Sequence, residues 1–158
     1  MTLHGKFIFQ DMCERKLTWD ISIPADLEKS WKKCCFDLPE LMSVKGTIAP
    51  FREAINSIQL HAFGDASLKG VCAVVYTVVS QESGTTQGLI TSKSQMSKNL
   101  TIPRLELVAG HMAVNLAVNV HDALQSCDPV VLCWLDSTVA LYWIQGSGEY
   151  CQFVANRV

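Results

Sequence analysis

The pattern of apolar and polar residues changes character near residue 59. From there onward short apolar segments dominate, and residues 71–79 form a long run rich in β-branched side chains. Such runs are typical of β-strands. Ser83-Gly84 is predicted to form a hairpin turn, with a return strand over residues 86–92 and a polar loop over residues 93–99. Together these segments predict an antiparallel meander.

The next segment has the period of an amphipathic helix over residues 102–125. Apolar residues recur every three or four positions from Leu105 through Met112 to Leu124, and Pro103 suits a first helical turn. Residues 130–135 are continuously apolar, which predicts a parallel strand buried on both faces. Ser137 is predicted to cap a helix over residues 138–145, and residues 150–155 to form a last strand.

The element order β-β-β-α-β-α-β predicts an α/β fold with three layers and a mixed five-stranded sheet. A right-handed crossover is expected between the first and fourth strands. Residues 1–58 are interpreted as an N-terminal extension with a helix over residues 24–36. Residues 59–158 are interpreted as the main domain.

Composition narrows the class of protein. The chain has 158 residues, 49% of them apolar, which is enough for one globular domain. A net charge of −2 provides no global attraction for nucleic acid, so any such contact requires a local patch. The seven cysteines lack metal-ligand spacing and are interpreted as free thiols of a reducing, intracellular compartment. We expect no signal peptide and no membrane span, because the longest apolar stretch falls far below the ~20 residues that a bilayer requires.

Three carboxylates in apolar settings are the strongest functional signal. Asp65 and Asp136 follow the first and fourth strands, which are expected to be parallel neighbours, and Glu106 lies in the first turn of the intervening helix. Three such charges repel one another unless a cation joins them. Mg²⁺ or Mn²⁺ suits carboxylate ligands, and two ions about 3.5–4 Å apart would support phosphodiester hydrolysis. Each aspartate taken alone is more often a turn or cap residue.

Polar residues beside these carboxylates are weaker candidates. Ser67, Lys69, Arg104 and Ser137 are predicted to contact nucleic acid, although isolated loop cations are usually only solvated. Lys93 and Lys98 belong to the same group. No nucleophile elbow accompanies either serine, so a serine hydrolase is not indicated.

Four segments resemble the ribonuclease H-like region of BEL/Pao-type LTR retrotransposon polyproteins, also known as the Pao retrotransposon peptidase family. They are residues 63–67 (FGDAS), 100–107 (LTIPRLEL), 134–138 (WLDST) and 153–158 (FVANRV). Residues 6–42, with KLTWD at 16–20, resemble the segment that follows the reverse transcriptase in these polyproteins.

This resemblance implies a ribonuclease H-like fold and cleavage of the RNA strand of RNA/DNA hybrids. It implies that Asp65 bridges two metal ions, and that Glu106 and Asp136 hold the ion on the leaving-group side. It also implies adjacent reverse transcriptase and integrase domains as partners, and a location in the cytoplasm or in virus-like particles. The family's fourth carboxylate belongs to a block beyond Val158. We therefore expect a C-terminally truncated domain, which is inactive if that carboxylate is indispensable.

Two alternatives remain open. The chain is an aspartic peptidase if Asp65 and Asp136 form a catalytic pair, although Glu106 then has no role. It is a non-catalytic remnant that binds nucleic acid or a polyprotein domain if the fourth carboxylate is indispensable.

Overall fold

Two helices occupy the first part of the chain, and a sheet with further helices occupies the second. The computed structural model describes residues 3–41, 49, 51–97, 99–124, 128–146 and 148–158. The chain divides into two units, Met1–Val44 and Lys45–Val158. The second unit includes residues 51–58, while the assignment of residues 1–58 as a functional segment of its own stays a prediction.

The first unit is built from α1 (Leu3–Glu14) and α2 (Ala25–Leu41). The helix predicted over residues 24–36 is confirmed as α2, whereas α1 was not anticipated. Ile8, Leu27 and Cys34 form the small buried cluster between these helices. Arg15 joins the two helices, since its guanidinium lies 2.8 Å from a carboxylate oxygen of Asp11 and 2.8 Å from one of Asp26.

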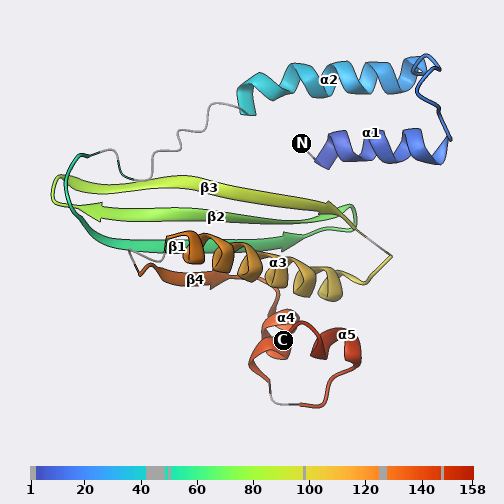
Figure 1. Cartoon of the computed structure of the whole chain (residues 1–158). Helices are drawn as coiled ribbons and strands as arrows, with labels where there is room; N and C mark the ends of the chain where they lie inside the picture. The colour runs from blue at the N-terminus through green and yellow to red at the C-terminus, as the bar shows by residue number, and fades with distance from the viewer. Residues whose placement is uncertain (1–2, 42–48, 50, 98, 125–127, 147) are drawn as a thin grey trace. The chain divides into compact units, whose positions relative to one another are not determined.

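The second unit contains a four-stranded sheet in the order β3-β2-β1-β4 (Figure 1). Its strands are β1 (Ile55–Ala66), β2 (Gly70–Gln81), β3 (Gly84–Met96) and β4 (Val130–Trp134). The antiparallel meander is confirmed, because β1 pairs with β2 and β2 with β3 in that sense. The parallel pairing of β1 with β4 is also as predicted, with Phe63 opposite Trp134.

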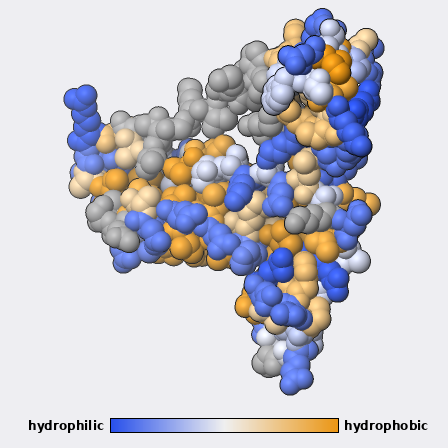
Figure 2. Space-filling view, turned by 45° about the vertical axis from the view of Figure 1, so that its right-hand side comes forward, coloured by the Kyte–Doolittle hydropathy of each residue, from blue (hydrophilic) through white to orange (hydrophobic). Residues whose placement is uncertain are grey.

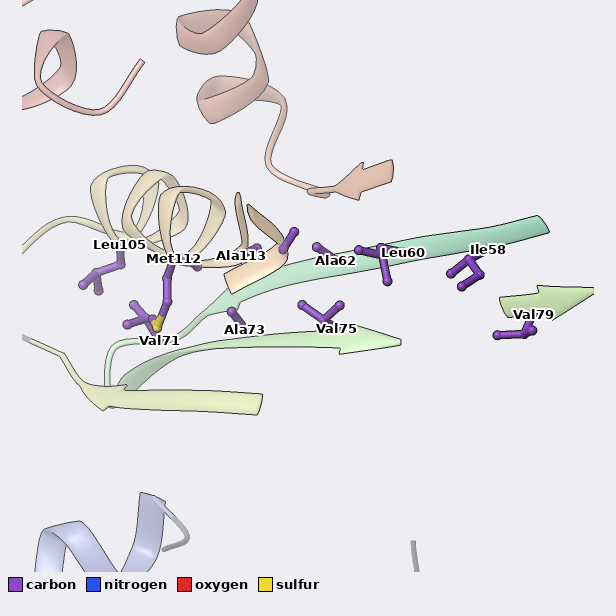
Figure 3. Close-up of a cluster of buried hydrophobic side chains, with 12 residues drawn as sticks. Ile58, Leu60, Ala62, Val71, Ala73, Val75, Val79, Leu105, Met112 and Ala113 are labelled. Carbon is purple, nitrogen blue, oxygen red and sulfur yellow. The ribbon is translucent and has the colours of Figure 1, made fainter. Parts of the chain in front are cut away.

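One face of this sheet is covered by α3 (Ile102–Ala123). Side chains alternate along β2, so that residues such as Val71, Ala73 and Val75 point to the same face. Figure 3 shows Leu105, Met112 and Ala113 of α3 directed toward this face. The hydrophobic core therefore lies between α3 and the sheet, while the surface of the second unit carries mixed hydrophobic and hydrophilic patches (Figure 2).

The meander differs from the prediction at two places. The turn occupies Glu82 and Ser83, one residue earlier than expected, and Gly84 opens β3 with a φ of 144° that glycine tolerates. Strand β3 continues to Met96, so the loop predicted from residue 93 is wrong over residues 93–96. Residues 93–96, three of which are polar, pair with β2, with Lys93 opposite Ala73. The pairing satisfies the backbone groups that face β2, despite the low strand propensity of these polar residues.

The C-terminal region also departs from the prediction. Helix α4 (Thr138–Gln145) is confirmed with its cap, but residues 150–155 form no fifth strand and contain the short helix α5 (Gln152–Ala155). The carbonyl of Cys151 accepts hydrogen bonds from the backbone N–H groups of Val154 and Ala155, at 2.9 and 3.0 Å. Burial of Val154 against Leu107 and α4 favours the helical turn over an extended segment.

Candidate metal centre

Asp65, Glu106 and Asp136 meet in the second unit. Asp65 is the penultimate residue of β1, and Asp136 comes two residues after β4. Glu106 is the fifth residue of α3, just beyond the first turn in which it was expected, because α3 begins at Ile102. One carboxylate oxygen from each residue lies within 4.8 Å of those of the other two. The three residues singled out from the sequence therefore form one cluster, at the edge where the parallel strands β1 and β4 end.

The parallel register of β1 and β4 explains why the two aspartates lie side by side. Phe63 pairs with Trp134, and each aspartate follows its paired residue by two positions. Asp65 and Asp136 are exposed, whereas Glu106 is buried. The cluster thus has two carboxylates open to solvent and a third that is buried.

Gly64 allows α3 to bring Glu106 close to β1. A Cβ atom built at Gly64 would lie 2.6 Å from the carbonyl oxygen of Ala109, which is too close for any side chain. At Gly110 an added Cβ would meet only the Leu135 side chain, at 3.2 Å. Backbone contact at Gly64 therefore sets the position of α3 next to Asp65.

The cluster is electrostatically strained. Burial raises the pKa of Glu106, the negative charges of Asp136 and then Asp65 raise it further, and a hydrogen bond from the backbone of Ala66 offsets only part of this rise. Its Oε2 atom is buried and has no hydrogen-bond partner among the described residues. A buried carboxylate oxygen without a donor is costly. A divalent cation removes both penalties, because it binds such oxygens and cancels their mutual repulsion, so these residues fit an Mg²⁺ or Mn²⁺ ion.

The neighbouring serines have local structural roles. Ser67 Oγ accepts hydrogen bonds from the backbone N–H groups of Lys69 and Gly70, at 3.3 and 3.2 Å, and shapes the turn between β1 and β2. Ser137 Oγ accepts one from Ala140 N at 3.3 Å and caps α4. Nucleic-acid contact by either serine stays a prediction.

The predicted cations are distributed unevenly. Lys69 lies in the exposed turn after β1, and Arg104 is exposed in the first turn of α3. Lys93 is exposed on β3, the edge strand opposite β4, and Lys98 lies outside the described residues. Their contact with nucleic acid stays a prediction as well.

Sequence reasoning gave no functional role to two further features. Cys72 is the register partner of Asp65, and its pKa is raised by burial and then by the charges of Asp65 and Glu106. Phe153 was part of the strand expected over residues 150–155 and Arg157 lay beyond it, but α5 and the residues that follow it bring Arg157 over the Phe153 ring. Phe153 and Arg157 are four residues apart, the spacing of neighbours on one face of a helix, and this spacing could have predicted their contact.

The sheet order, the crossover helix and the three clustered carboxylates define a ribonuclease H-like α/β domain. The chain belongs to the Pao retrotransposon-like RNaseH-like domain family, whose model matches residues 1–137. This match includes all three carboxylates, while residues 138–158 lie beyond it. No curated protein matches the chain. None of the helices in the described ranges is both long and apolar enough to cross a membrane.

Proposed function

We propose that this domain hydrolyses phosphodiester bonds with the help of Mg²⁺ or Mn²⁺ held by Asp65, Glu106 and Asp136. The observation that carries the proposal is the meeting of three carboxylates within 4.8 Å, one of them with a buried oxygen that lacks a partner. Pairs of divalent ions activate water and stabilise the leaving oxygen in such reactions.

Each carboxylate has a distinct part in this proposal. Glu106, which is buried on α3 between Leu105 and Leu107, would supply a fixed carboxylate ligand to the ion. Asp65 and Asp136, which are exposed, would supply ligands on the side open to solvent, from which a phosphate could approach. Gly64 keeps α3 at the distance from β1 that this arrangement requires.

We propose the RNA strand of an RNA/DNA hybrid as the substrate. Membership of an RNaseH-like family in retrotransposons supports this choice, since reverse transcription produces such hybrids. The adjacent reverse transcriptase and integrase domains of the parent polyprotein are proposed partners on the same ground. The aspartic peptidase alternative gains no support from the geometry, because Glu106 shares the cluster and both neighbouring serines are engaged in local hydrogen bonds.

The test is cleavage of a labelled RNA/DNA hybrid with Mg²⁺ or Mn²⁺, compared with EDTA and with Asp65→Asn. Asp122→Asn is the matched control, because it removes the same charge near the other end of α3. We expect cleavage that EDTA and Asp65→Asn abolish and that Asp122→Asn leaves intact.

Two results would contradict this proposal. A folded protein that binds Mn²⁺ without cleaving the hybrid would mean that the three carboxylates do not suffice for hydrolysis, as expected if the family's fourth carboxylate is indispensable. Proteolysis that pepstatin inhibits and EDTA leaves unchanged would instead favour the peptidase alternative.

A further inference from the structure

Two arginines, one from the first turn of α3 and one that follows α5, share one aromatic ring. The guanidinium carbon of Arg157 lies 4.0 Å from the centroid of the Phe153 ring, and that of Arg104 lies 5.2 Å from it. Arg157 Nη1 also donates a hydrogen bond of 2.8 Å to the backbone carbonyl of Phe153. The ring contacts both guanidinium groups, and the hydrogen bond holds Arg157 in addition. We call Arg104, Phe153 and Arg157 the arginine clamp.

Neither arginine of the clamp has a carboxylate partner within the part of the chain that the structure describes. The ion pairs found there involve Arg15, Lys32 and His121 instead. One N–H of Arg157 is used by the Phe153 carbonyl, which leaves the other donors of its planar fork available. Two guanidinium groups near one ring repel each other, and an anion that contacts both would relieve this repulsion.

The surroundings of the clamp are also positive. It borders a groove of about 580 Å³ whose charged lining residues are Lys93 and Arg157, with no acidic side chain among the described ones that line it. The pKa of Cys151 is lowered, first by a hydrogen bond from the backbone N–H of Val154 and also by the charge of Arg104. This local patch contrasts with the net charge of −2 for the whole chain.

The clamp is tied to the elements that carry the carboxylates. Arg104 lies in the first turn of α3, and Glu106 follows it by two residues. Val154 of α5 packs in one buried cluster with Leu107 of α3 and Ala140 of α4, the helix that follows Asp136. A ligand strand held at the clamp is therefore attached to the same helices that position the candidate metal centre.

We propose that the arginine clamp binds the phosphodiester backbone of the nucleic acid that the carboxylate cluster cleaves, an inference that rests on the proposed function. Arginine forks bind phosphate oxygens through paired hydrogen bonds, and backbone contacts of this kind set register without reading sequence. The clamp holds the strand beside the metal centre and contributes affinity that is independent of base sequence.

The experiment measures the binding of a fluorescent RNA/DNA hybrid in EDTA, where metal-dependent cleavage is off, between 50 and 200 mM salt. The variants are Arg104→Gln, Arg157→Gln and Phe153→Leu. Arg52→Gln is the matched control, because it removes one positive charge just before β1, at the end of the strand opposite Asp65. Melting temperatures identify any variant that fails to fold, and Arg157→Lys retains the charge without the planar fork.

We expect each arginine-to-glutamine change to raise Kd about tenfold and to lower the slope of log K against log salt by about 1. Phe153→Leu should have a smaller effect in the same direction, and Arg157→Lys should restore the slope but only part of the affinity. Arg52→Gln should change neither quantity by a comparable amount.

Three outcomes would overturn the clamp. The first is that Arg104→Gln and Arg157→Gln bind the hybrid with the same Kd as the control variant Arg52→Gln. The second is a poly-glutamate peptide that displaces the hybrid as well as unlabelled hybrid does, which would assign the clamp to an acidic polypeptide. The third is a wild-type protein that does not bind the hybrid. Clamp-dependent binding without cleavage in Mg²⁺ would support the clamp and contradict only the proposed hydrolysis.

Discussion

Strands β1 and β4 run parallel in register, yet they have very different surroundings. Leu60 and Ala62 of β1 are fully buried, while the register partner of Leu60, Val131, is 37% exposed. Strand β1 has a neighbour on each side, whereas β4 forms one edge of the described sheet. Position in the sheet, rather than an apolar sequence, therefore determines how deeply these two strands are buried.

The ends of these two strands matter for the candidate site, whereas their interiors matter for stability. Both strands end beside a carboxylate of the candidate metal centre, and the site requires only that their ends stay in register. A short exposed strand is sufficient for that purpose. We therefore expect substitutions at the strand ends to affect activity equally, and substitutions within the strands to affect stability unequally.

The largest expected effect is on cleavage. Asp65→Asn and Asp136→Asn should each reduce metal-dependent hydrolysis of the hybrid by at least about 100-fold, because each removes a charged ligand from the ion. Neither change should lower the melting temperature, since both relieve repulsion between carboxylates. Cleavage rates with thermal melts are the measurement. If one variant lost its cleavage activity and the other kept nearly all of it, the two strand ends would not be equivalent.

The next prediction compares two register partners. Leu60→Ala should lower the free energy of unfolding by about 2–5 kcal/mol, because it leaves a cavity under α3. Val131→Ala should cost less than about 1 kcal/mol, because its side chain is already partly in solvent. Urea titration of both variants measures the difference. Equal losses would mean that β4 is covered in solution by something outside this chain.

Sequence patterns predicted most of the fold and all three carboxylates, for physical reasons that the strands make clear. The run over residues 71–79 and the stripe through Leu105 and Met112 match the periods of the strand and helix that they form. The predicted parallel pairing of the first and fourth strands, with Glu106 on the helix between them, then indicated that Asp65, Glu106 and Asp136 would meet, as the structure confirms.

What escaped prediction depends on contacts between distant segments. Burial of β4 was expected on both faces and is wrong, because its exposure follows from its edge position, which its own sequence does not encode. Strand β3 extends through residues 93–96 only because β2 supplies its hydrogen-bond partners. The helix α5 depends on Val154 packing against Leu107, and the clamp at Arg157 depends on that helix.

A smaller effect is expected where α3 contacts the ends of the two strands. Gly64→Ala should destabilise the protein by about 1–3 kcal/mol, because the new methyl group meets the backbone of Ala109 and cannot be accommodated by a side-chain rotation. Gly110→Ala should be neutral or stabilising by less than about 1 kcal/mol, because Leu135 can shift and alanine favours the helix. Thermal unfolding tests both. If Gly110→Ala were as unstable as Gly64→Ala, the Leu135 side chain would not be able to move away from the new methyl group.

The smallest expected effect concerns Glu106 and its pH dependence. The folded protein raises the pKa of Glu106 above the ordinary value of 4.5, so the ionised side chain destabilises the metal-free fold. This penalty is absent below pH 4.5 and develops as pH rises through the folded-state pKa. Glu106→Gln should therefore raise the melting temperature by a few degrees in EDTA at neutral pH, and the gain should vanish in acid.

In Mg²⁺ the wild type should melt at a higher temperature than Glu106→Gln, the reverse of the order in EDTA. The ion stabilises the wild-type carboxylate but binds the amide of Glu106→Gln weakly. Melting curves at pH 4 and pH 7.5, each with EDTA or with Mg²⁺, separate the two contributions. A Glu106→Gln protein that melts below the wild type in EDTA at neutral pH would mean that the carboxylate stabilises the fold by itself. In that case Glu106 Oε2 would have a hydrogen-bond partner in solution. The protein alone would then hold the three carboxylates together, without a metal ion.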